Sequence, residues 1–140
     1  MNALVTYYSQ TGNTRAIAGP MYEELSEHFS CKIHPLDECS ISSLDEFDLI
    51  LVGSPCHAGT LAAPVREFLS LLPEAPSFHL AGFITHASSV YQKSDYENCI
   101  TFLRSLCISK RISYHGCFEC RGMLAAALHD YIKRKNNVSD

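Results

Sequence analysis

The sequence has no tryptophan and little positive charge, and these two shortages restrict what the protein can bind. Its 11 lysine and arginine residues are outnumbered by 15 aspartate and glutamate residues, which gives a formal net charge of −4. A chain with this balance has no electropositive field that would attract a phosphate backbone, so we expect no nucleic-acid partner. The lack of tryptophan removes one large flat side chain that could stack on a ring-shaped ligand.

Long apolar segments are also missing. The first residues show no basic segment followed by an apolar run, and no later stretch approaches the roughly 20 apolar residues that span a bilayer. We therefore expect a cytoplasmic protein without membrane insertion. We also expect it to be a monomer or a weak dimer. With 140 residues, 46% of them hydrophobic, the chain is expected to form one domain over residues 1–140.

Cysteine is abundant, but its pattern does not suggest a disulfide framework. The number is odd and most positions lie in apolar runs, as expected of thiols in a reducing compartment: Cys31, Cys39, Cys56, Cys99, Cys107, Cys117 and Cys120. The last two form a Cys-x-x-Cys pair with His115 and His129 nearby. One such pair supplies too few ligands for structural zinc, so we predict no metal site. A redox-active disulfide between them remains an alternative to packed thiols.

Apolar runs that favour strands alternate with helical patterns along the chain. We expect strands at residues 3–8, 31–36, 47–52, 80–85 and 111–118. The first helix is indicated by an apolar stripe at Ile17, Met21, Leu25 and Phe29, and further helices are expected at residues 64–72, 94–106 and 123–133. Pro20 should kink the first helix or break its hydrogen-bond ladder. Residues 37–46 look too short and polar for a regular crossover helix.

This alternation predicts an α/β fold, a doubly wound five-stranded parallel sheet with helices on both faces and strand order 2-1-3-4-5. In such sheets a ligand binds outside the carboxyl ends of the strands, near the switch point between strands 1 and 3. The loops that follow Tyr8, Val52 and Thr85 are therefore the candidate site.

The first of these loops has the composition of an anion cradle. Its hydroxyl groups can donate hydrogen bonds, its glycine permits a tight turn, and the N–H groups of the following helix point into the same space: Ser9, Gln10, Thr11, Gly12, Asn13 and Thr14. It lacks the lysine of a nucleotide-triphosphate loop and the three spaced glycines of a dinucleotide loop. A monophosphate ester therefore fits better than a polyphosphate. A plain capped helix start is the alternative.

The pattern Ser-x-Thr-Gly-x-Thr after an N-terminal hydrophobic strand resembles the phosphate loop of the flavodoxin family. The resemblance extends through the strand and helix pattern over nearly the whole chain, and the length resembles the short-chain branch. It implies a flavodoxin-like fold, a bound flavin mononucleotide (FMN) and a role in electron transfer.

The resemblance also implies two loops that flank the flavin ring. The first is Ser54, Pro55, Cys56, His57, Ala58 and Gly59, where His57 occupies the usual aromatic place and the Ala58 to Gly59 peptide matches the one that changes orientation on flavin reduction. The second offers Tyr91 for stacking and backbone groups for the polar edge of the ring at His86, Ala87, Ser88 and Ser89. The alternatives are an exposed loop histidine at position 57 and a tyrosine packed on its own loop at position 91.

The function that follows is a low-potential electron carrier between redox partner proteins, with no catalytic residue of its own. Acidic surroundings should lower the potential of the last reduction step, and the candidates are Asp37, Asp45, Asp95 and Glu97, although each also fits an ordinary solvated surface. One alternative function is an FMN-dependent NAD(P)H or quinone reductase. Another is a binding module that keeps the fold and has lost FMN.

Overall fold

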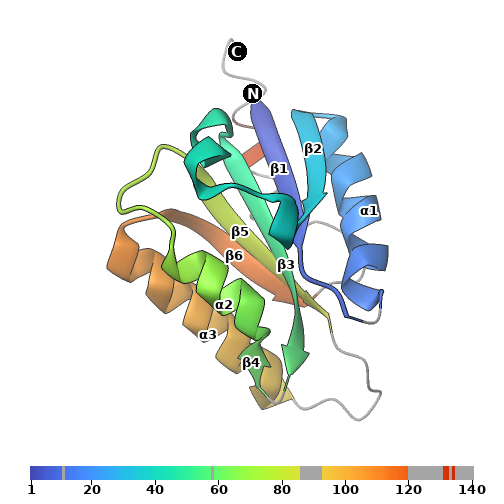
Figure 1. Cartoon of the computed structure of the whole chain (residues 1–140), viewed down its shortest axis with the longest axis vertical. Coiled ribbons are helices and arrows are strands. Elements are labelled where there is room, and N and C mark those ends of the chain that lie inside the picture. The colour runs from blue at the N-terminus through green and yellow to red at the C-terminus, as the bar shows by residue number, and fades with distance from the viewer. Residues whose placement is uncertain (11, 58, 86–92, 120–130, 133, 135–140) are drawn as a thin grey trace.

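The fold alternates strands and helices along the whole described chain (Figure 1). The computed structural model describes residues 1–10, 12–57, 59–85, 93–119, 131–132 and 134. The strands are β1 (Asn2–Tyr7), β2 (Ser30–Pro35), β3 (Leu49–His57), β4 (Thr60–Leu61), β5 (His79–Thr85) and β6 (Ser113–Glu119). The helices are α1 (Asn13–Ser26), α2 (Ala63–Ser70) and α3 (Lys93–Lys110), with short 3-10 helices η1 (Leu36–Glu38) and η2 (Ile41–Glu46).

The sheet has the predicted topology. The order of its parallel strands is β2-β1-β3-β5-β6, which is the predicted order 2-1-3-4-5 once the short strand β4 is set aside. Strand β4 pairs antiparallel with the end of β3 and was not predicted. The doubly wound α/β fold is therefore confirmed, with one small hairpin added at its carboxyl end.

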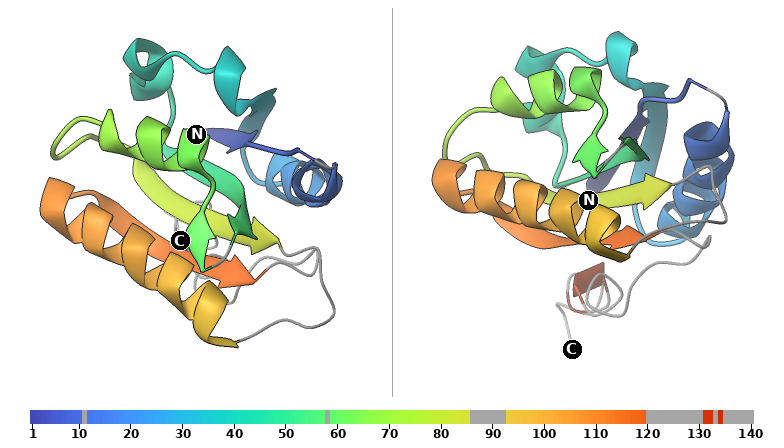
Figure 2. Two further views of the ribbon diagram at one scale, coloured as in Figure 1. Left: turned by 60° about the horizontal axis from the view of Figure 1, so that its bottom comes forward. Right: turned by 90° about the horizontal axis from the view of Figure 1, so that it is seen from below.

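Helices lie on both faces of the sheet, α1 on one face and α2 with α3 on the other (Figures 1 and 2). The central strand β1 shows why: Ala3 and Val5 pack in the core beneath α1, whereas Leu4 packs in the core beneath α2 and α3. All three side chains are buried, because a central parallel strand is covered on both faces. This explains the continuous apolar run that identified the strand in the sequence.

Helix α1 continues through Pro20, so the expected interruption does not end it. Its buried residues are Thr14, Ala18, Met21 and Leu25, which repeat at the spacing of one helical face. The connection between β2 and β3 contains only η1 and η2, as its short polar sequence indicated. The predicted closing helix at 123–133 falls almost entirely outside the described residues.

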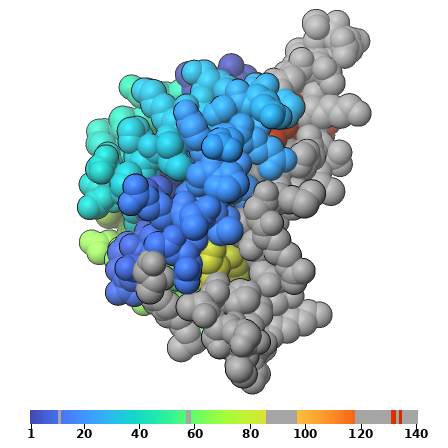
Figure 3. Space-filling view, turned by 90° about the vertical axis from the view of Figure 1, so that its right-hand side faces the viewer, coloured from blue at the N-terminus to red at the C-terminus, as the bar shows by residue number. Residues whose placement is uncertain are grey.

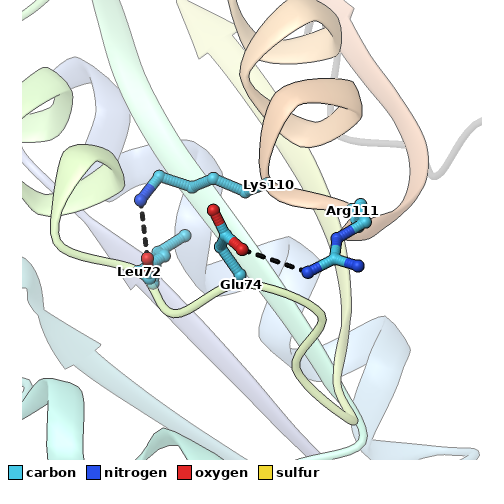
Figure 4. A network of polar contacts seen from close by, with 4 residues as sticks. All are labelled: Leu72, Glu74, Lys110 and Arg111. Atoms are coloured by element: carbon cyan, nitrogen blue, oxygen red, sulfur yellow. Dashed lines mark hydrogen bonds and ion pairs between the residues drawn. The ribbon is translucent and has the colours of Figure 1, made fainter.

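Polar contacts fasten the end of α3 to the segment that follows α2 (Figure 4). The Lys110 ammonium donates hydrogen bonds to the carbonyl oxygens of Ser70 (2.9 Å) and Leu72 (2.6 Å). Arg111 forms an ion pair with Glu74 at 3.0 Å. These contacts lie where β5 and β6 begin, at the opposite end of the sheet from the candidate loops. No helix among the described residues is long and apolar enough to cross a bilayer.

Candidate functional site

The loop after β1 has the backbone of an anion-binding turn. Gly12 precedes α1 with φ of 91°, a left-handed conformation that favours glycine. The Ser9 hydroxyl accepts a hydrogen bond from the Gly12 N–H at 3.0 Å, which closes the turn. A Cβ atom built on Gly12 would have no neighbour within 4 Å, so the space above this residue is open. Thr11, the third predicted donor, lies outside the described residues.

The start of α1 presents donors to that open space. The first helical hydrogen bond runs from the Ala16 N–H to the Gly12 carbonyl at 2.9 Å, so the N–H groups of Asn13, Thr14 and Arg15 have no carbonyl of a preceding turn to bind. The first turn contains no acidic residue, and Arg15 adds a positive charge. A helix start with these properties attracts an anion. The sequence reasoning did not single out Arg15.

The hydroxyl of Thr14 has a partner within the protein. It lies 2.7 Å from the hydroxyl of Thr85 at the end of β5, and Thr14 is only 1% exposed. This buried bond holds the start of α1 to the sheet and connects two of the three candidate loops. In this structure the Thr14 side chain therefore positions the loop, and its partner Thr85 was missed because the two residues are 71 positions apart.

A cavity of about 800 Å³ opens beside the loop. One side is formed by the end of β1 and the loop, including Tyr8, Ser9, Gln10 and Gly12, and the other by residues 35–41 and the outer side of α2. Such a volume suits a ligand with a ring system. The cavity extends from the loop toward β2, and none of the described residues of the 53–59 segment lines it. Figure 3 shows the side of the molecule on which α1 lies, and α1 forms much of that surface.

The first ring-flanking segment is largely strand, which corrects the predicted strand boundary. Strand β3 continues through His57 and turns back into β4, with Cys56 opposite Leu61. The turn includes Gly59 at φ of 80°. The buried Ser54 hydroxyl explains the extension, because it accepts a hydrogen bond from the N–H of Ala62 (3.0 Å) and donates one to the carbonyl of Pro55 (2.8 Å). Ser54 thus joins the hairpin to the start of α2.

Several predicted flavin contacts lie outside the described residues. These are Ala58, the side chain of His57, and the whole second loop with His86, Ala87, Ser88, Ser89 and Tyr91. Pro55 and Cys56 are half-buried at the end of β3. The structure therefore places the loop after β1 and the end of β3 at the same edge of the sheet, and the ring contacts remain predictions.

The acidic candidates are divided between the two ends of the sheet. Asp37 lines the cavity, and so does Glu67 on α2, which the sequence reasoning missed. Asp45 lies at the opposite end, beside Glu46, whose carbonyl accepts a hydrogen bond from the Asn2 side chain at the start of β1. The prediction that Asp45 lies at the binding end was therefore wrong. The connection through η1 and η2 runs the length of the sheet and brings Asp45 to the end where β1 begins. Glu97 is exposed on α3, and the side chain of Asp95 lies outside the described residues.

The Cys-x-x-Cys pair is described only at Cys117, which is buried against Gly82 of β5. Burial raises the pKa of its thiol to about 12. Among the described residues no group of His, Cys, Asp or Glu side chains could hold a metal ion. Among the described residues, another pair of thiols lies close together, because the sulfur atoms of Cys56 and Cys99 are 3.3 Å apart.

Comparison with known proteins agrees with this geometry. A family model described as flavodoxin domain matches residues 4–139. A flavodoxin from the domain Archaea superimposes with a TM-score of 0.68 at 16% identity, over 99% of this chain and 96% of that one. A flavodoxin from Streptococcus pneumoniae gives 0.71 at 14% identity, over 99% of both chains. A Fusobacterium nucleatum flavodoxin bound to flavin mononucleotide gives 0.65 at 13% identity, over 81% of this chain and 68% of that one.

No curated protein sequence gives a significant match. The sheet order and the glycine turn that precedes α1 define a flavodoxin-like α/β protein. Because the family match covers almost the whole length, the chain belongs to the flavodoxin family.

Proposed function

We propose that this protein binds FMN and carries electrons at low potential between partner redox proteins. The observation that supports this most directly is the turn at Gly12, where a left-handed glycine faces open space and the N–H groups of a helix start lie beside it. These groups suit a single phosphate, because they are neutral donors and Arg15 adds one positive charge beside them. The family membership and the FMN in one structural relative point to the same ligand.

The groups that would hold the phosphate are the Ser9 hydroxyl and the N–H groups of Asn13, Thr14 and Arg15, with Gln10 beside them. When bound, FMN supplies the redox chemistry through its isoalloxazine ring. The protein positions it: the Thr14–Thr85 bond fixes the start of α1, and the Ser54 hydrogen bonds fix the end of β3. The ring contacts of His57 and Tyr91 belong to this proposal.

The charges around the cavity support a low potential. Asp37 and Glu67 line it and Glu38 is exposed beside Asp37, whereas Arg15 is the single basic residue among the described residues of its lining. Negative charge near the ring disfavours the addition of electrons to it. Replacing Asp37 and Glu67 together by Asn and Gln should therefore raise the potential of the last reduction step in a redox titration. If the potential does not change, these two carboxylates do not lie close enough to the flavin to affect it.

Asn13→Asp tests the phosphate site. The substitution keeps the shape of the side chain, and an acidic residue in the first turn favours a helix, so the fold should survive. The new charge should repel the phosphate and weaken FMN binding by about 100-fold. Riboflavin, which has no phosphate, should bind the variant and the parent protein equally. Quenching of flavin fluorescence measures both affinities.

Asn2→Asp is the matched control, since it makes the same chemical change at the other end of β1, where Asn2 is exposed. It should leave FMN affinity unchanged. Equal FMN affinity for Asn13→Asp and the parent would contradict the proposed placement. Oxidation of NADPH by the purified protein without a partner reductase would favour the reductase alternative instead.

A further inference from the structure

Among the described residues, four cysteine side chains gather in the core beneath α3. Cys99 and Cys107 come from α3, Cys117 from β6, and Cys56 from the end of β3. The first three are buried, and Cys56 packs against the same core while remaining half-buried. We call these four residues the thiol cluster. Nothing in the proposed flavin chemistry requires it.

Within the thiol cluster one pair is close enough to react. The Cys56 and Cys99 sulfur atoms are 3.3 Å apart, and a disulfide bond needs about 2.05 Å, so an approach of little more than 1 Å suffices. The two residues belong to separate elements, because Cys56 lies where β3 enters the hairpin with β4 and Cys99 lies in the first half of α3. Figure 1 shows β4 beside that part of α3.

The two thiols differ in access to solvent. Cys56 is half-buried, whereas Cys99 is 0% exposed. A small reagent in solution can therefore reach Cys56 first, and Cys99 can act only on what is already attached to Cys56. This is the arrangement of an attacking thiol with a resolving thiol behind it.

We propose that Cys56 and Cys99 form a reversible redox site that low-molecular-weight disulfides oxidise to an intramolecular disulfide. The Cys56 thiolate attacks one sulfur of the reagent, which forms a mixed disulfide and releases one thiol. The Cys99 thiolate then attacks the Cys56 sulfur, which forms the internal bond and releases the second thiol. Two cysteine thiols lose two electrons and two protons, and one reagent disulfide gains them.

The other members of the thiol cluster are poor competitors for this reaction. Burial raises the pKa of Cys117 to about 12 and that of Cys107 to about 11, so each has little reactive thiolate near neutral pH. Both are also buried away from a reagent in solution. The reaction should therefore select the pair that contains the half-buried thiol.

The bond would join the end of β3 to α3 across a separation of 43 positions in the sequence. Closing a loop of this length restricts the unfolded chain, so the oxidised protein should melt roughly 10 °C higher than the reduced protein. The bond would also fix the Ser54 to Gly59 segment, which the proposed function places beside the flavin. The redox site itself does not depend on flavin binding.

Peptide mapping tests which thiols react. The full chain is equilibrated with oxidised and reduced glutathione, its remaining thiols are alkylated, and it is digested with trypsin and glutamyl endopeptidase. Each cysteine then lies in a different peptide. We expect residues 47–66 to be linked to residues 98–104, with the mass of two hydrogen atoms lost. A link to residues 112–119, or complete alkylation of both cysteines, would overturn the proposal.

Variants test the order of the two steps. Cys99→Ser should retain glutathione on Cys56, because the resolving thiol is gone, and Cys56→Ser should form neither product. Cys31→Ser is the control, since Cys31 is a half-buried thiol on β2 and belongs to the opposite core. It should keep both the link and the rise in melting temperature. If Cys99→Ser does not fold, the map of the unmodified chain still decides.

Discussion

The two faces of the sheet are buried by different chemistry. Among the described residues, the core beneath α1 is made of alanine, valine, leucine, isoleucine, methionine and aromatic residues, and the cysteine packed against it, Cys31, is only partly buried. The core beneath α2 and α3 contains three buried cysteines and two further cysteines packed against it. Most of the thiols that an oxidant could modify should therefore lie on one face, while the other supports the phosphate loop through α1.

A glycine makes room on each face, and the two differ in what they accommodate. A Cβ atom on Gly53 of β3 would overlap the ring of Phe83, which is completely buried beneath α1. A Cβ atom on Gly82 of β5 would lie 2.6 Å from the end of the Leu103 side chain and 3.1 Å from the Cys117 sulfur. A rigid ring surrounded by packed atoms cannot move aside as a leucine methyl group can.

We therefore expect Gly53→Ala to have the largest effect on stability. It should lower the free energy of unfolding by about 3 kcal/mol or more, whereas Gly82→Ala should cost about 1 kcal/mol. Urea unfolding of both variants measures the difference. Leu103→Ala should cost less stability in the Gly82→Ala background than in the parent protein, and Phe83→Leu should cost less in the Gly53→Ala background than in the parent. Equal costs for the two glycines would contradict the contrast between the faces.

The buried thiols predict a loss of stability in alkali. Their pKa values in the folded protein, about 12 for Cys117 and about 11 for Cys107, exceed the value of 9.0 for an unperturbed thiol. Both states are protonated below pH 9, so the contribution to stability is intact there. Above pH 9 the unfolded chain ionises first, and stability falls until the folded thiols also ionise.

The expected fall is about 2 kcal/mol for each of the two thiols between pH 9 and pH 11, measured by urea unfolding with a reductant present. Cys117→Ala lowers stability at every pH because it leaves a cavity, but the slope with pH should decrease. Cys31→Ser provides the comparison from the opposite core. The pKa of Cys31 is raised to about 11, also chiefly by burial, so this variant should remove its own smaller share of the slope. If Cys117→Ala left the slope with pH unchanged, ionisation of Cys117 would not be a cause of the loss of stability in alkali.

The sequence was sufficient for the fold because each central strand is buried on both faces and so appears as an uninterrupted apolar run. It was less informative at the end of β3. Gly53, Ser54 and Pro55 are residues typical of turns, yet β3 continues through them. The reasons are long-range: Gly53 accommodates Phe83, and Ser54 binds the backbone of Ala62. Residue preferences alone contain neither contact.

The candidate site was predictable only where local sequence determines it. The turn at Gly12 follows from local sequence, because a small polar loop between a strand and a helix has few conformations. The role of Thr14 depends on Thr85, and the pairing of Cys56 with Cys99 depends on how α3 crosses the end of β3. The position of the cavity depends on side chains of η1 and α2. Each of these is a tertiary contact between distant segments.

The buried Thr14–Thr85 bond should be the main polar link between α1 and the sheet. Thr14→Val leaves the Thr85 hydroxyl without its partner in a buried position, which should cost about 1.5 kcal/mol in urea unfolding. Replacing both residues by valine removes both polar groups and should cost less than the single change. Thr14→Ser should be nearly neutral for this bond. If the double variant lost more free energy of unfolding than the two single variants added together, the bond would not be the source of the effect.

The ion pair between Arg111, at the end of α3, and Glu74 should contribute least to stability. Arg111 and Glu74 lie 3.0 Å apart, but their side chains are 70% and 68% exposed, so water and salt screen their attraction. Glu74→Gln should change the free energy of unfolding by less than about 0.5 kcal/mol, and added salt should abolish the difference. Lys110→Met is the contrasting variant, because its ammonium binds two carbonyl oxygens, and it should cost more. A larger effect at Glu74 than at Lys110 would show that surface charge, rather than satisfied backbone carbonyls, fastens α3.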